Sequence, residues 1–258
     1  RKMMPVFIED LERRDHSGIP DELRDGFVRA ISAPGFKAEV GEIRFHEDVM
    51  LIGLGSEERV DETAARKAGA SALRALDRSG IDAIEVATRL DWDGRPVAGL
   101  LSAFAEGTAL ANWRLDGYDG TNAKERTTHP RLRIASARKD GNAALKEGLR
   151  LAEAINLART VGDTPPNVCH PTWVARQARK LARQVDGLTC KVIDASKAEA
   201  MGMGGIVNVG KASEIPPCLI QLEWKPKRSA AKARDKHLVL VGKTITYDTG
   251  GYSLKISG

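Results

Sequence analysis

Two lysines and an aspartate stand close together near the end of the chain, around a pair of glycines. Lys243 follows an apolar run, Asp248 precedes Gly250 and Gly251, and Lys255 comes shortly afterwards. Ligands of open α/β sheets bind at the carboxyl ends of strands, and glycine lets the backbone approach a ligand closely. These charges therefore indicate a ligand site. A buried Lys–Asp ion pair that braces a turn is the alternative interpretation.

Two short segments have the spacing of phosphate-binding loops, but each lacks a required part. Residues 205–211 have the spacing GxxxxGK, yet Ala212 stands where such loops place a Ser or Thr for Mg²⁺. Pro216 and a predicted strand follow, whereas a phosphate loop leads into a helix whose N-terminus faces the anion. Residues 242–244 (GKT) match the end of the same pattern, but His237 stands where the pattern places its first glycine. We predict no nucleotide site at either segment.

The hydrophobic pattern of the first half predicts strands that alternate with helices. Ala64, Ala68 and Leu76 recur at helical spacing, and Gly80 lies where that helix should end. The alternation is typical of an α/β fold with a largely parallel sheet. We expect strands at 39–46, 49–55, 81–88 and 131–136, and helices at 61–79, 96–113 and 142–161.

A second series of alternating helices and strands is predicted after a proline-containing turn at residues 163–167. It predicts a glycine-rich tight turn at 202–205 and a basic loop at 225–236, which we interpret as a solvated hairpin loop. We expect one α/β domain over 1–140 and the start of a second, with a mostly parallel or mixed sheet, over 141–258. The expected elements of the second domain are helices at 171–185 and 197–201 and strands at 188–195, 218–224 and 237–242.

The composition is that of a folded protein, with 42% hydrophobic and 29% charged residues in a chain of 258. No apolar run approaches the roughly 18 residues of a membrane span. Cys169, Cys190 and Cys218 form no CxxC pair, which favours reduced core thiols and a cytoplasmic location. The net charge of +5, spread over the chain, is too small to indicate a nucleic-acid partner.

The segment VGKTITYDTGGYSLK resembles the signature VGKGITFDTGGxSLK of the leucine aminopeptidase family, which contains cytosolic dinuclear-metal aminopeptidases. Three earlier segments agree with the family in order and spacing. ARTVGDTPPNVCHP, which contains Arg159, Pro166, Asn167 and Pro171, resembles the entry to the catalytic domain. Two further segments follow with the order and spacing of the family's motifs: EAMGMGGIVNVGKAS and PPCLIQLEW. The resemblance covers about residues 154–255, and the part before 140 matches only as a generic α/β domain.

This resemblance implies that Lys243 and Asp248 bind metal and that Lys255 polarises the scissile carbonyl. It also implies two divalent ions per subunit, with Zn²⁺, Mn²⁺, Mg²⁺ and Co²⁺ as candidates, which would activate a water molecule. The substrates would be peptides with a free N-terminus, and the assembly a homo-hexamer without a membrane or nucleic-acid partner. A DNA-binding or otherwise non-catalytic member of the same family is the alternative.

The resemblance also implies two more aspartates and a glutamate after the signature. The glutamate would lie within a motif of the form NTDAEGR, which also carries the arginine that positions the general base. No such motif occurs in these 258 residues. Asp194 and the earlier carboxylates precede the signature, so they cannot take those places. We therefore expect that the sequence is part of a longer protein, and that it would be inactive alone.

Overall fold

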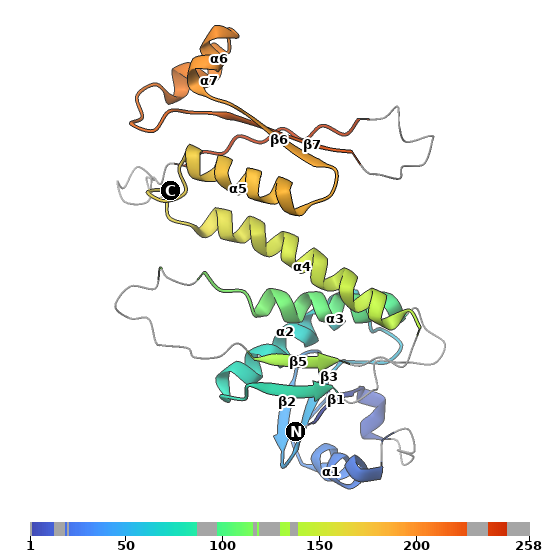
Figure 1. Cartoon of the computed structure of the whole chain (residues 1–258). Coiled ribbons are helices and arrows are strands. Elements are labelled where there is room, and N and C mark those ends of the chain that lie inside the picture. The colour runs from blue at the N-terminus through green and yellow to red at the C-terminus, as the bar shows by residue number, and fades with distance from the viewer. Residues whose placement is uncertain are drawn as a thin grey trace. The chain divides into compact units, whose positions relative to one another are not determined.

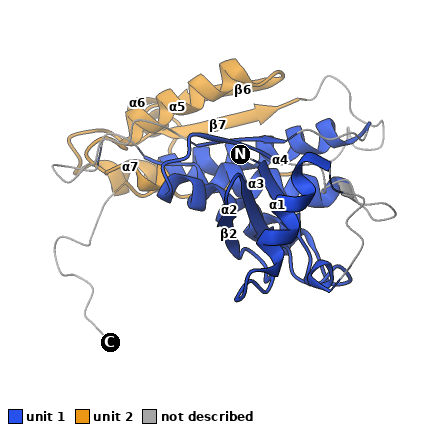
Figure 2. Ribbon diagram, turned by 90° about the horizontal axis from the view of Figure 1, so that it is seen from below, with its two compact units in different colours: residues 1–160 blue, residues 161–258 orange. Residues whose placement is uncertain are grey.

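A computed structural model describes residues 2–12, 19, 21–86, 97–115, 118, 130–134, 139–225 and 237–246. The chain divides into two compact units, residues 1–160 and 161–258 (Figure 2). The border between the units lies near the end of a long helix, α4 (Gly141–Asp163). The domain border expected from the sequence, at residue 140, lies just before the start of that helix. No helix in the described ranges is both long and apolar enough to cross a membrane.

Unit 1 is built on a five-stranded sheet in which the strands run in the order β2-β3-β1-β4-β5. All neighbours pair in parallel except β2 and β3, which form an antiparallel hairpin. The expected α/β architecture with a mostly parallel sheet is therefore confirmed for this unit (Figure 1). The strands are β1 (Lys2–Val6), β2 (Ile43–His46), β3 (Val49–Gly53), β4 (Ala83–Val86) and β5 (Arg131–Ile134).

Helices cover both faces of this sheet, because side chains on each strand alternate between the faces. Met3 and Met50 belong to a core cluster with α2, α3 and the start of α4, whereas Met4 and Leu51 belong to a second cluster with α1. The bounds are η1 (a 3-10 helix, Ile8–Leu11), α1 (Asp21–Ser32), α2 (Glu62–Arg78), α3 (Val97–Ala111) and α4 (Gly141–Asp163).

Local sequence signals account for the ends of α2. The Asp61 carboxylate accepts a hydrogen bond from the backbone N–H of Ala64 at 2.7 Å, which caps the first turn. After the helix, Gly80 has a φ of +64°, a conformation that glycine adopts at little cost. The expected helix at 61–79 is thus confirmed nearly to the residue.

Close helix packing in unit 1 depends on small residues. A side chain at Gly69, Gly107 or Gly148 would overlap with the backbone of a neighbouring helix. These contacts join α2 to α3 and α3 to α4. Arg66 of α2 also forms a 2.9 Å ion pair with Glu106 of α3, whose side chain is only 8% exposed. The first half of α4 is therefore packed against α3.

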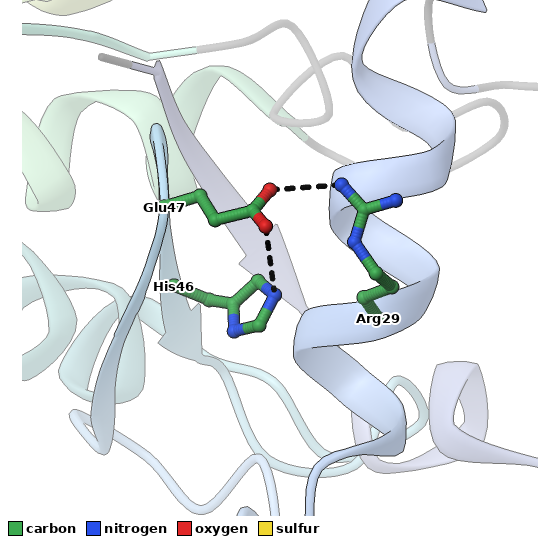
Figure 3. A network of polar contacts seen from close by, with 3 residues as sticks. All are labelled: Arg29, His46 and Glu47. Atoms are coloured by element: carbon green, nitrogen blue, oxygen red, sulfur yellow. Dashed lines mark hydrogen bonds and ion pairs between the residues drawn. The ribbon is translucent and has the colours of Figure 1, made fainter.

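The β2–β3 hairpin is tied to α1 by a surface ion pair (Figure 3). Glu47, in the turn, has a φ of +47°, and its carboxylate accepts a 2.8 Å hydrogen bond from Arg29 of α1. The same carboxylate lies 4.0 Å from Nε2 of His46. The hydrogen bond from Arg29, supported by its charge, lowers the pKa of Glu47, whose side chain is well exposed.

Unit 2 contains an antiparallel pair, β6 and β7, with α5 packed against both strands (Figure 1). Pairing runs from Leu188 opposite Trp224 to Ile193 opposite Leu219. In this unit, the described residues contain no parallel strand pair. The bounds are α5 (Pro171–Gln184), β6 (Leu188–Ile193), α6 (Ala195–Ala200), α7 (Gly204–Gly210) and β7 (Leu219–Trp224).

Several elements differ from the sequence-based expectation. The glycine-rich region after Met201 is only partly a turn: Gly202 has a φ of +72°, but α7 begins at Gly204. The pattern also predicted neither β1, a short apolar run that contains a proline, nor α1, a helix that contains Gly26. Their formation depends on packing with distant parts of the chain, which outweighs weak local signals.

Candidate metal centre

The segment that precedes the candidate site is extended but is not part of a sheet. Residues 237–246 were expected to begin as a strand at 237–242, and no strand forms there. Their large apolar side chains are mostly exposed, from 65% at Ile245 to 93% at Val241. An apolar strand needs neighbouring strands to satisfy its backbone groups and cover its side chains. None of the described strands pairs with this segment, so the expectation of a strand is wrong here.

Lys243 lies within this extended segment, and its side chain is exposed. The other two predicted site residues, Asp248 and Lys255, lie outside the described residues. The structure therefore places one of the three and does not bring them together. Within the described ranges, no group of three or more His, Cys, Asp or Glu side chains is arranged to hold a metal ion.

The segment matched to the family's entry motif has a clear structural role at its start. Arg159 of α4 lies 4.0 Å from the ring centroid of Trp113, which follows α3. Its guanidinium donates to the backbone oxygen of Leu110 at 2.9 Å and to Oδ1 of Asn156 at 3.0 Å. Trp113 in turn donates to the hydroxyl of Thr160 at 3.1 Å. Arg159 thus holds the end of α4 against the end of α3.

Backbone hydrogen bonds organise the turn that follows α4. The N–H groups of Val168 and Cys169 both donate to the carbonyl of Pro165, at 2.9 and 2.8 Å. Nδ1 of His170 then accepts a hydrogen bond from the N–H of Trp173 and caps α5. Pro171 occupies the first turn of that helix, where its missing N–H costs nothing. The motif's prolines and histidine therefore set the direction in which α5 begins.

The cysteines of unit 2 are free thiols rather than disulfides. Burial raises the pKa of Cys169, and its Sγ donates to the carbonyl of Val161. Burial also raises the pKa of Cys218, although the nearby charge of Arg179 opposes this effect. A raised pKa favours the neutral thiol, which is a poor metal ligand and nucleophile. Cys169 is buried, as expected of a core residue, whereas Cys190 and Cys218 are only partly buried.

The phosphate-loop spacing at 205–211 is explained by a different structure. Most of this segment forms the short helix α7, which is followed by a turn and then by β7. A side chain at Gly210 would overlap with the ring of Pro217, so this glycine permits a close approach. This segment therefore lacks the loop-to-helix geometry of a phosphate-binding loop.

The two domain models of one protein family both match this chain. Residues 21–121 match the N-terminal domain of the cytosol aminopeptidase family, and residues 156–258 match its catalytic domain. A probable cytosol aminopeptidase of Dechloromonas aromatica is 35% identical over 212 residues, which are 80% of this chain and 42% of the relative. The chain spans about half the length of the curated relatives it matches.

Solved structures show the same similarity in three dimensions. A mutant of tomato leucine aminopeptidase superposes with a TM-score of 0.74 at 24% identity, over 97% of this chain and 52% of the tomato chain. A complex of the bottromycin maturation enzyme BotP with Mn superposes with a TM-score of 0.67 at 25% identity. It covers 88% of this chain and 45% of BotP.

Proposed function

Because the chain belongs to the cytosol aminopeptidase family, we propose that the whole protein is a metal-dependent aminopeptidase. It would release N-terminal amino acids from peptides that have a free α-amino group. The observation that carries this proposal is the ordered match of one chain to both domains of the family, at 21–121 and 156–258. A single short motif can arise by chance, whereas two domain matches in the correct order rarely do.

We assign three residues of the segment 243–255 to the site. Lys243 and Asp248 would bind metal, and Lys255 would donate to the substrate carbonyl. Amine and carboxylate donors suit Zn²⁺, Mn²⁺, Co²⁺ or Mg²⁺. Of these donors the described ranges hold Lys243 alone, so the assignment rests on family membership. Two divalent ions at such a centre would supply activated water and charge stabilisation of the tetrahedral oxyanion.

The chain's own lysines have distinct tasks in this scheme. As a ligand, Lys243 would donate its neutral amine, a form that an adjacent dication favours. Lys255 would keep its proton and stabilise negative charge on the carbonyl oxygen, a contribution that grows as the bond order falls. The free α-amino group of the peptide would anchor the substrate at the same centre. This anchoring would restrict cleavage to the first peptide bond.

Metal dependence and N-terminal specificity can be tested together on the intact protein. We expect release of the first residue from a peptide, and none from the same peptide with an acetylated N-terminus. Dialysis against a chelator should abolish release, and Mn²⁺ or Zn²⁺ should restore it. Full activity after chelation, or equal cleavage of the acetylated peptide, would contradict the proposal.

Assembly, location and domain border are further parts of the proposal. The relatives are named cytosol aminopeptidases, which supports a cytoplasmic protein. We propose a homo-hexamer with two divalent ions per subunit, and an N-terminal domain that ends at about residue 140. Light scattering combined with elemental analysis of the intact protein measures both subunit number and metal content. A monomer, or a single metal ion per chain, would require revision of the scheme.

A further inference from the structure

A histidine occupies the capping position of α5, whereas aspartates cap two other helices of the chain. Nδ1 of His170 accepts a hydrogen bond from the backbone N–H of Trp173 at 3.3 Å. The corresponding acceptors of α2 and α6 are the carboxylates of Asp61 and Asp194, at 2.7 and 2.8 Å. Ser, Thr, Asp and Asn are the usual capping residues, because their side-chain oxygens accept from the first turn. An imidazole cap has a different chemistry.

The first turn of α5 depends on this imidazole. The N–H groups at the start of a helix have no partner within the helix. Pro171 has no N–H, and the N–H of His170 donates to the carbonyl of Val168 at 2.9 Å. Of the next two N–H groups, that of Thr172 belongs to an exposed residue and that of Trp173 is bonded to the ring of His170. Loss of this acceptor would leave the Trp173 N–H without its partner.

Only a neutral imidazole can cap a helix in this way. A neutral ring has one nitrogen with a free lone pair, whereas both nitrogens of the protonated ring carry hydrogen and can only donate. Histidine changes its charge between about pH 5 and 8, and His170 is only partly buried, so protons from the solvent reach the ring. Aspartate loses its proton near about pH 4, so carboxylate caps stay ionised over the same range. Mild acid should therefore affect the cap of α5 and leave those of α2 and α6 in place.

The charges of α5 itself oppose a proton on His170. The N-terminus of a helix carries a partial positive charge, so a cation is unfavourable there. The helix contains no Asp or Glu, and its charged side chains are all cations: Arg176, Arg179, Lys180 and Arg183. A protonated His170 would therefore lose its hydrogen bond and add a further positive charge to the same helix.

The elements next to α5 provide no paired carboxylate to compensate. Strands β6 and β7, which pack against the helix, carry one exposed cation and one exposed carboxylate, Lys191 and Glu223. The turn before the helix begins with Asp163, which is also exposed. Among the described residues, neither carboxylate forms an ion pair with His170. Water screens exposed charges of this kind, so they contribute little to holding a proton on the ring.

A thiol connects this first turn to the start of β7. Sγ of Cys218 donates to the carbonyl of Pro171 at 3.6 Å, which is a weak hydrogen bond. Burial raises the pKa of Cys218 and of Cys169, which precedes His170, so both thiols stay uncharged in mild acid. Cys190 of β6 is also a free thiol. The weak contact from Cys218 leaves the His170 cap as the stronger restraint on the turn.

We propose that His170 makes the first turn of α5 sensitive to acid. The turn is capped while the imidazole is neutral, and it opens when Nδ1 takes up a proton. The open turn binds the proton more readily than the capped turn, so the open population grows as the pH falls. Opening frees the N–H of Trp173 and weakens the contact between Pro171 and Cys218. Such a device does not depend on the proposed peptidase activity.

Three variants of the intact protein test this device. His170→Asn keeps a capping oxygen that does not titrate, and His170→Ala removes the acceptor at every pH. His237→Asn replaces an exposed histidine of the same unit and is the matched control. Hydrogen exchange, measured by mass spectrometry on peptides from the start of α5, reports opening of the turn. The proteins are compared at the same pH, so that the intrinsic pH dependence of exchange cancels.

The unmodified protein should match His170→Asn at about pH 8 and His170→Ala at about pH 5. A capping acceptor changes the ratio of folded to open forms by a factor of about 5. In acid, the first turn of the unmodified protein should therefore exchange about 5-fold faster than that of His170→Asn. His237→Asn should follow the unmodified protein at each pH. Peptides from the first turns of α2 and α6 should show no difference between the proteins.

Equal exchange of the unmodified protein and His170→Asn at both pH values would overturn the proposal. So would a difference between these two proteins that is largest at the higher pH, because the proton would then stabilise the turn. An equal change of α5 exchange in His237→Asn would assign the pH effect to another histidine. Circular dichroism shows whether each variant is folded. If His170→Ala does not fold, the comparison of the unmodified protein with His170→Asn still decides.

Discussion

The guanidinium of Arg159 lies 4.0 Å from the ring centroid of Trp113, so that the last turns of α4 are clamped to the residue that follows α3. The same guanidinium donates to the carbonyl of Leu110. This clamp lies immediately before the change from unit 1 to unit 2 at residue 160. It therefore holds the first residues of the segment matched to the catalytic domain, 156–258, against the end of α3.

Loss of this clamp should destabilise the protein measurably. Arg159→Ala removes a cation–π contact worth about 0.5–2 kcal/mol and hydrogen bonds from a charged donor, so we expect a loss of about 2–3 kcal/mol. Differential scanning calorimetry measures the effect on the transition of unit 1. Arg150→Ala, an exposed arginine on the same helix, is the control and should change stability by less than about 0.5 kcal/mol. Equal effects of the two substitutions would exclude a specific clamp.

The Arg29–Glu47 pair predicts a pH-dependent contribution to stability (Figure 3). The hydrogen bond from Arg29 lowers the pKa of Glu47 below its ordinary value of 4.5. A lowered pKa means that the contribution is fully present above pH 4.5 and disappears as the pH falls through the folded-state pKa. Glu47→Gln should therefore destabilise the protein at neutral pH and have progressively less effect in acid.

Chemical unfolding at a series of pH values measures the Glu47 effect. Its size should be small, because both side chains are more than half exposed. Glu58→Gln, at an exposed position without a cation in contact among the described residues, is the control. A Glu47→Gln effect that grows as the pH falls would show that the sign of the linkage is wrong.

Metal content should separate the proposed roles of Asp248 and Lys255. Asp248→Ala removes a proposed ligand, so we expect the intact protein to lose metal and activity together. Lys255→Ala should retain metal and lose turnover by about 10²–10³-fold, the usual effect of one oxyanion-stabilising contact. Elemental analysis and peptide hydrolysis, measured on both variants, provide the comparison. Metal loss in Lys255→Ala with retention in Asp248→Ala would reverse the assignment.

Local patterns in the sequence were enough to predict most helices and paired strands. The alanine and leucine spacing of α2 and its terminal Gly80 are signals within one segment, and the structure confirms them. The family resemblance also depends on motifs in order along the chain, and the comparisons confirm it. The rejection of a phosphate loop at 205–211 needed only Ala212 and the following prolines.

Other features depend on pairing between distant residues, which a local pattern does not encode. The short segment of β1 gave no strand signal, yet its backbone pairs with β3 and β4 at the centre of the sheet. The apolar residues 237–242 gave a strong strand signal and form no strand among the described residues, because a strand exists only with a partner.

Helix α5 illustrates the same division. The sequence alone determined that four cations recur at helical spacing without an intervening carboxylate, namely Arg176, Arg179, Lys180 and Arg183. Only the tertiary structure decided that the opposite side of the helix packs on β6 and β7 and that the cations are left exposed. The physical reason is that helical spacing follows from backbone geometry within one segment, whereas exposure depends on which surfaces the rest of the chain covers.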